Sequence, residues 1–153
     1  MATREETLES KGYAVANAPA PGGIYQPAVV VDGMVYLSGA VPVADGTLTA
    51  AGSVPSKVSV EEARKAAELC AANLLRVFVR DVGTLATIRR IVKVTGFVNS
   101  DPDFTEPHVV VNGASQLLID VLGEAGKHAR SAVGMATLPL GASVEIELIA
   151  ALQ

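Results

Sequence analysis

The residues best suited to chemistry in this chain are an arginine and two glutamates near the C-terminus, Arg130, Glu145 and Glu147. A guanidinium binds a carboxylate through two parallel N–H donors, and a nearby carboxyl group can move a proton or orient a water molecule. Small residues lie between these groups along the chain and leave room for a ligand. The combination predicts a pocket for a small anionic substrate.

Two antiparallel strands are expected to hold these groups, one on each side of a Pro-Leu-Gly-Ala turn at residues 139–142. Alternation with a period of two places one set of side chains toward the core and the other on the opposite face. The expected core set is Val133, Met135, Val144, Ile146 and Leu148. The expected site set is Arg130, Ala132, Gly134, Ala136, Glu145 and Glu147.

The expected hairpin also predicts an oligomer. It places Ala136 opposite Glu145, so Arg130 lies about 20 Å from Glu145 at roughly 3.3 Å per residue. An arginine side chain cannot span that distance within one chain. If both residues serve one site, they come from different subunits of a closed oligomer with head-to-tail interfaces.

Composition limits the class of protein. At 153 residues the chain is expected to be one domain with a substantial core. Half of the residues are hydrophobic and only 18% are charged, an apolar balance that favours burial of surface against partners. The net charge of −4, without a basic cluster, disfavours nucleic acid as a partner.

No membrane partner or metal is expected. The sequence has no apolar run of transmembrane length and no secretory signal at its N-terminus, so a cytoplasmic location is expected. His108 and His128 lack cysteine or paired carboxylates at ligand spacing, which disfavours a zinc site. Cys70 falls at a helical core position, where burial suppresses thiol reactivity.

Local signals predict the element order ββαβαββ. The Asp32-Gly33 turn separates strands at 28–31 and 34–38, and the Ser59-to-Glu62 capping box begins a helix that ends near Asp81. A strand at 90–98, a helix at about 106–124 and the C-terminal hairpin follow. The predicted fold is an α+β two-layer sandwich in which both helices cover one face of a mostly antiparallel sheet and Arg130 lies on the open face.

The predicted domain boundaries are a flexible N-terminus over residues 1–12 and a single domain over residues 13–153. The first helix is expected to bury one stripe and expose Arg76. That stripe is Ala63, Ala67, Cys70, Leu74 and Val77, and the stripe of the second helix is Val111, Ala114, Leu118, Val121 and Leu122.

Some candidate residues also have a structural interpretation that the sequence leaves open. Tyr25 lies in a loop rich in proline and glycine, at residues 16–27, and either contributes to a pocket or anchors the loop. Arg130 fits a salt bridge at a strand start as well as a ligand clamp.

Three segments resemble the YjgF/RidA family of reactive intermediate deaminases, often labelled endoribonuclease L-PSP. They are the Tyr25 loop with Tyr36-Leu37-Ser38-Gly39-Ala40-Val41-Pro42, the strand Val92-Lys93-Val94-Thr95-Gly96-Phe97-Val98, and Ala129-Arg130-Ser131-Ala132-Val133 with Glu145-Ile146-Glu147. The resemblance covers nearly all of the chain from about residue 13, and its C-terminal part is the most specific.

The resemblance implies a chorismate-mutase-like fold and a homotrimer whose sheets face a central barrel, with three sites between subunits. It also implies hydrolysis of small 2-imino acids to 2-oxo acids and ammonia, without metal or organic cofactor. Arg130 would bind the substrate carboxylate, and Glu145 would orient water or the imine nitrogen. The matching pocket positions are Tyr25, Ser38, Gly39, Asn112 and the main-chain carbonyl of Ala132. For Asn112 the alternative is a structural role at the start of the second helix.

Departures from the family pattern indicate a divergent branch. Ala132 replaces a common cysteine, Ala40 replaces a frequent glutamine, and the segment at 104–111 is longer. Two other functions therefore stay open. One is a non-catalytic trimer that binds small carboxylates or partner proteins, as a regulator or chaperone. The other is an endoribonuclease, which the acidic charge and the lack of base-stacking aromatic residues disfavour.

Overall fold

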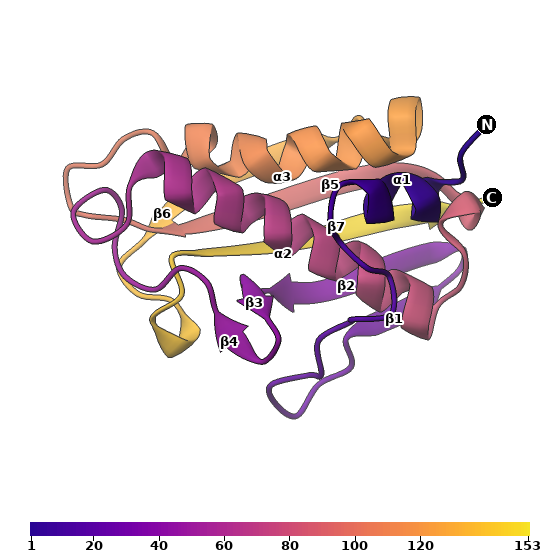
Figure 1. Cartoon of the computed structure of the whole chain (residues 1–153), viewed down its shortest axis with the longest axis horizontal. Coiled ribbons are helices and arrows are strands. Elements are labelled where there is room, and N and C mark those ends of the chain that lie inside the picture. The colour runs from indigo at the N-terminus through magenta and orange to yellow at the C-terminus, as the bar shows by residue number, and fades with distance from the viewer.

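A five-stranded sheet forms the centre of the molecule in a computed structural model that describes residues 1–153. In spatial order its strands are β1 (Ala28–Val31), β2 (Met34–Ala40), β7 (Val144–Leu152), β5 (Ile88–Asn99) and β6 (Ala129–Met135). All neighbours are antiparallel except β5 and β6. A small sheet of β3 (Val43–Ala44) and β4 (Thr47–Leu48) lies beside it (Figure 1). The mostly antiparallel sheet confirms the predicted α+β class.

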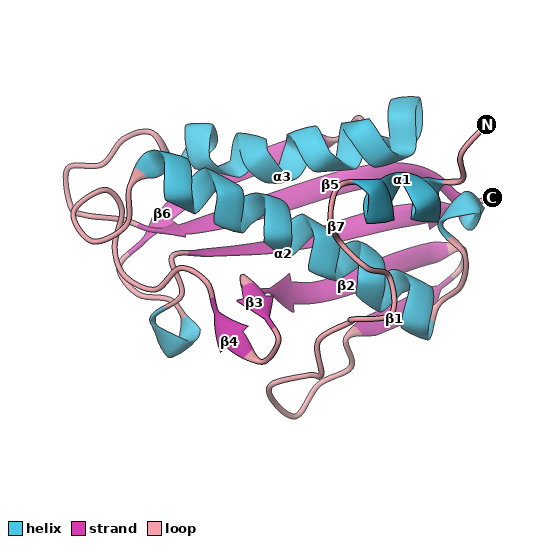
Figure 2. Cartoon of the chain, in the orientation of Figure 1, coloured by secondary structure: helices cyan, strands magenta, loops and turns pink.

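Two long helices, α2 (Val60–Asp81) and α3 (Pro107–Leu122), lie side by side over one face of the sheet (Figure 2). Ser59 begins α2 as predicted, because its hydroxyl accepts the Glu62 amide at 3.1 Å. The helices approach closely at Gly113, where a side chain would clash with a backbone carbonyl of α2. Short 3-10 helices are η1 (Leu85–Thr87), η2 (Gly123–Gly126) and η3 (Pro139–Gly141). No helix is long and apolar enough to span a bilayer.

The predicted stripes of both helices are buried between the helices and the sheet, which confirms the two-layer arrangement. Arg76 of α2 differs from the expectation, since it is only 6% exposed. Its Nε donates to the carbonyl of Ala14 at 2.7 Å and its Nη1 to Asn73 at 2.9 Å. This arginine therefore ties the segment before β1 to α2.

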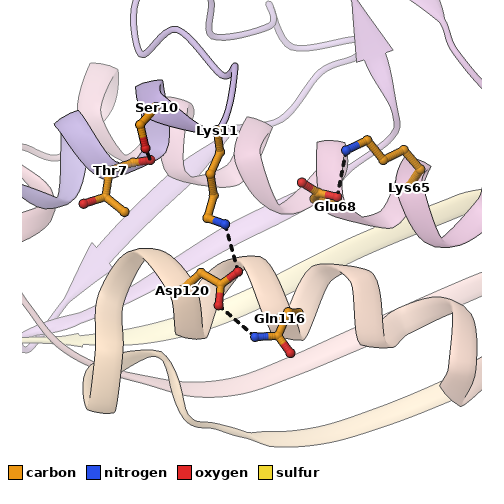
Figure 3. A network of polar contacts seen from close by, with 7 residues as sticks. All are labelled: Thr7, Ser10, Lys11, Lys65, Glu68, Gln116 and Asp120. Atoms are coloured by element: carbon orange, nitrogen blue, oxygen red, sulfur yellow. Dashed lines mark hydrogen bonds and ion pairs between the residues drawn. The ribbon is translucent and has the colours of Figure 1, made fainter.

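The N-terminal residues form a helix, α1 (Arg4–Ser10), where the sequence predicted a flexible segment over residues 1–12. A capping box of Thr3 and Glu6 begins it, and the Leu8 side chain is completely buried in the core. Just beyond α1, Lys11 pairs with Asp120 of α3 at 2.9 Å (Figure 3). The structure differs from that expectation because tertiary contacts stabilise a helix too short to be stable alone.

The prediction of a C-terminal hairpin was wrong, because β6 and β7 do not pair and β5 lies between them. β6 pairs in parallel with β5, where Arg130 is beside Val94. α3 forms the crossover from β5 to β6, and parallel strands require a connection of this kind. A strand followed by a helix and then by a second strand is a sequence pattern typical of two parallel strands joined by a crossover helix.

This pairing reverses the faces predicted for β6. Arg130 points toward α3, and Ala132 packs against the core. Val133 and Met135, predicted to be core, are 41% and 37% exposed. For β7 the prediction is confirmed, since Val144, Ile146 and Leu148 are buried and the two glutamates alternate with them on the open face.

Candidate functional site

Arg130 is held at the edge of the sheet by neutral oxygen atoms from α3. Its Nη1 donates to Asn112 Oδ1 at 2.8 Å and to Ser115 Oγ at 3.1 Å, and Nη2 donates to the carbonyl of His108 at 3.4 Å. Asn112 and Ser115 share one face of α3 because they are three residues apart. Partial burial lowers the pKa of the Arg130 guanidinium, which nevertheless stays cationic.

No carboxylate pairs with Arg130 in this structure. Both hydrogens of Nη1 are used by Asn112 and Ser115, whereas Nε donates to no group of the chain. The edge formed by Nε and the remaining hydrogen of Nη2 is thus available as a two-donor fork. A carboxylate fits this edge in a bidentate geometry. Arg130 therefore does not form the salt bridge considered from the sequence, and its free edge has the geometry that a carboxylate requires.

Glu145 lies at the start of β7, on the open face of the sheet, against Gly39 of β2. A side chain at position 39 would collide with the Glu145 carboxylate, so this close approach requires glycine. β2 and β7 lose their regular register between Leu37 and Ala40, which brings Gly39 to this position. Burial, followed by the charge of Glu147, raises the pKa of Glu145 above its usual value.

Tyr25 and Ser38 line the same cavity as Gly39 and Glu145, which has a volume of about 1570 Å³. The Ser38 hydroxyl donates to the carbonyl of Gln26 at 2.6 Å and holds the end of the Tyr25 loop against β2. The Tyr25 hydroxyl accepts the amide of Gly22 at 3.2 Å. Tyr25 is therefore both a local anchor of its loop and part of the cavity wall.

The candidate residues fall into two half-sites within one chain. The arginine half-site contains Arg130 and Asn112, and the glutamate half-site contains Tyr25, Ser38, Gly39 and Glu145. Ala132 lies two residues beyond Arg130 on the helix-covered side of β6 and belongs to neither group of polar contacts.

The two half-sites are separated by the order of the strands and not by the length of the predicted hairpin. Phe97 of β5 pairs with both Glu145 and Val133, so Arg130 lies three residues from the level of Glu145. That offset is about 10 Å along the strands and about 10 Å across them, less than the predicted separation. The Arg130 and Glu145 side chains also leave the sheet on opposite faces. One chain therefore does not bring them together.

Sequence reasoning missed Ser115 and His128 beside the arginine. His128 Nε2 lies 2.9 Å from Ser115 Oγ, and His128 Nδ1 lies 2.6 Å from the carbonyl of Gly126. Two spacings could have indicated this cluster, since Ser115 is three residues after Asn112 on a helix and His128 is two residues before Arg130 on an extended segment.

Other titratable residues do not form a metal site in this structure. No three histidine, cysteine, aspartate or glutamate side chains gather in a position to hold an ion. Cys70 is fully buried, and burial followed by the charge of Glu145 raises the pKa of its thiol well above the ordinary value. The predicted core position of Cys70 is confirmed.

Comparisons with known proteins agree with the resemblance seen in the sequence. A family model described as endoribonuclease L-PSP matches residues 15–152. Protein TCP17 of Trypanosoma cruzi is 38% identical over 143 residues, which cover 93% of this chain and 89% of that protein. A RutC family protein of Pasteurella multocida is 34% identical, over 88% of this chain and 92% of its own length.

Solved structures match the whole fold. A protein of unknown function from Agrobacterium tumefaciens is 44% identical, with a TM-score of 0.89 over 98% of this chain and 92% of that one. TdcF of E. coli, solved with bound serine, is 26% identical, with a TM-score of 0.65 over 90% of this chain and 95% of its own. The chain is thus closer in backbone to the Agrobacterium protein than to TdcF.

Proposed function

The chain belongs to the endoribonuclease L-PSP family, and from its two half-sites we propose that it hydrolyses small 2-imino acids to 2-oxo acids and ammonia. The proposed active site combines the arginine half-site of one subunit with the glutamate half-site of the next subunit in a homotrimer.

The observation that carries this proposal is the uncompensated charge of Arg130. Three neutral oxygens orient the guanidinium, and no carboxylate of the chain neutralises it. A partly buried cation that is fixed but unpaired favours an anionic ligand. The serine bound to TdcF is a small molecule with a carboxylate, which supports a ligand of this kind for a relative with the same fold.

The glutamate half-site supplies the proton chemistry that imine hydrolysis requires. Water adds to the imine carbon, a proton moves to the nitrogen, and the C–N bond then breaks to release ammonia and leave the 2-oxo acid. A carboxyl group whose pKa is raised toward neutrality exchanges protons more effectively near neutral pH. We assign to Glu145 the orientation of the water and the transfer of its proton to the leaving nitrogen.

The assignment requires an oligomer, because each chain holds only separated halves of the proposed site. The open face of the sheet is apolar enough to be covered by other subunits. Its exposed apolar side chains include Val29, Val31, Tyr36, Val133 and Met135. In the proposed homotrimer, neighbouring subunits bury this face, and Arg130, on the edge strand β6 of one subunit, lies near Glu145 of the next.

The first test is titration of 2-oxobutyrate, the product analogue, into the wild type and the Arg130→Lys variant. Lysine keeps the charge but lacks the planar two-donor fork, so we expect the variant to lose about 1.5–3 kcal/mol of binding free energy. Arg64→Lys is the matched control, since Arg64 is exposed on α2 and does not line the cavity. Equal affinity of the Arg130 variant and the wild type would contradict the proposed clamp.

Turnover distinguishes the enzyme from the alternatives. We expect the wild type to accelerate ammonia release from an imino acid generated in situ, and Arg130→Lys to lose most of that rate. Carboxylate binding without turnover would identify the non-catalytic binding protein instead. Salt-sensitive binding and cleavage of RNA would support the activity that the family description names.

A further inference from the structure

A chain of hydrogen bonds lies behind Arg130, on the side away from its free edge. Ser115 Oγ receives the Nη1 donor of Arg130 at 3.1 Å and lies 2.9 Å from His128 Nε2. His128 Nδ1 lies 2.6 Å from the carbonyl of Gly126 in η2. The carbonyl, the imidazole and the hydroxyl thus form one path that ends at the guanidinium.

The direction of every bond in this path follows from the chemistry of its ends. The Gly126 carbonyl can only accept, so His128 Nδ1 carries a hydrogen and donates. Burial lowers the pKa of His128 and outweighs the hydrogen bond to the Gly126 carbonyl, which raises it, and the charge of Arg130 lowers it further. The ring is therefore neutral near pH 8, and Nε2 has a lone pair. The Ser115 hydroxyl must then donate to Nε2, which leaves its oxygen to accept from Arg130.

We propose that His128 and Ser115 are positioning residues of Arg130, and that they determine which edge of its guanidinium meets the substrate carboxylate. A serine hydroxyl alone rotates and points its hydrogen toward the cation in part of its conformations. The His128 acceptor removes those conformations and keeps a lone pair facing Nη1. With both Nη1 hydrogens occupied, the Nε and Nη2 edge is the one presented to a ligand.

This inference rests on the proposed function for its effect on ligand binding, but its structural part can be tested without a ligand. Nitrogen NMR of the free wild type should show His128 as the neutral tautomer with its hydrogen on Nδ1. It should also show slow rotation of the Arg130 guanidinium about its Nε–Cζ bond. We expect faster rotation in both Ser115→Ala and His128→Ala. A hydrogen on Nε2, or rotation unchanged in both variants, would overturn the proposal.

The second arm measures 2-oxobutyrate affinity at about pH 8, where the histidine is neutral. Ser115→Ala and His128→Ala should each weaken binding about three- to tenfold, the range for one lost hydrogen bond. Because His128 acts through Ser115, the double variant should lose no more than the larger single loss. His128→Gln restores an acceptor near the position of Nε2 and should bind within about twofold of wild type.

Ser131→Ala is the matched control, since Ser131 also lies on β6 but its hydroxyl accepts a hydrogen bond from Lys93 at 3.1 Å and makes none with the Arg130 side chain. Its affinity should equal that of the wild type. Losses that add in the double variant, or a Gln variant as weak as His128→Ala, would overturn the proposal. If the NMR experiments give the expected result but the affinity for 2-oxobutyrate does not depend on Arg130, then His128 and Ser115 do position Arg130 and the proposed function is wrong.

Discussion

Glu145 combines a catalytic assignment with a destabilising location. Gly39 leaves space for its carboxylate beside β2, but burial and the neighbouring Glu147 raise its pKa. The folded state therefore favours the protonated form more than the unfolded state does. This contribution to stability is present below the unfolded pKa and is lost as the pH rises through the higher folded pKa.

Glu145→Gln should consequently stabilise the protein at neutral pH. Glutamine has a similar shape without the charge, so we expect a higher urea midpoint at about pH 7 and no difference at about pH 4. Catalysis should be lost in the same variant. Asp103→Asn removes an exposed carboxylate elsewhere and serves as the control. A gain for Glu145→Gln that is equal at both pH values would contradict the role of ionisation.

At the scale of elements, one crossover unit builds the arginine half-site. β5 leads into α3 and then into β6, so α3 presents Asn112 and Ser115 above Arg130. Gly96 of β5 allows the close packing, since a side chain there would collide with Val111 of α3. The orientation of the arginine is therefore a property of the whole unit, and any shift of α3 over the sheet changes it.

α1 gives a direct test of how the N-terminal segment packs. Leu8→Ala removes a completely buried side chain, so we expect a loss of about 2–4 kcal/mol in the free energy of unfolding, measured with urea. The exposed Lys11–Asp120 pair in Figure 3 contributes less, and Lys11→Met should cost under about 1 kcal/mol. A Leu8→Ala variant as stable as Ser10→Ala would show that the segment is frayed, as the sequence alone predicted.

At the scale of the whole molecule, one chain keeps the arginine half-site and the glutamate half-site apart. Arg130 and Glu145 lie on opposite faces of the sheet, and the strand β5 separates β6 from β7. Completion by a neighbouring subunit follows from this arrangement if both residues act on one substrate. The apolar open face gives such an assembly a large surface to bury.

Mixing two inactive variants tests the shared site. Suppose that Arg130→Ala and Glu145→Ala are each inactive but still trimeric. After refolding together in equal amounts, about three quarters of the trimers are mixed, and each mixed head-to-tail ring contains one interface with both residues intact. About a quarter of all sites should then recover activity. No recovery, despite mass spectrometry showing mixed trimers, would contradict the intersubunit pair.

Signals close together in the sequence were sufficient to predict most of the individual helices and strands. The Ser59 cap and the apolar stripe define α2, and Asp32-Gly33 defines the β1–β2 turn, because these features depend on local hydrogen bonds and backbone angles. The sequence also determined the family, and with it Arg130, Asn112, Glu145 and Gly39 as candidates. These positions lie in contiguous motifs that can be recognised without a fold.

The tertiary structure alone decided which strands are neighbours and which face each side chain takes. β6 contains alternating residues, but its small and apolar side chains fit either face, so periodicity could not say that Val133 is exposed and Arg130 covered. Leu8 likewise becomes buried only because it packs against residues distant in the chain. Strand order, the depth of burial and the Ser115–His128 pair all depend on such distant contacts, which a local pattern does not encode.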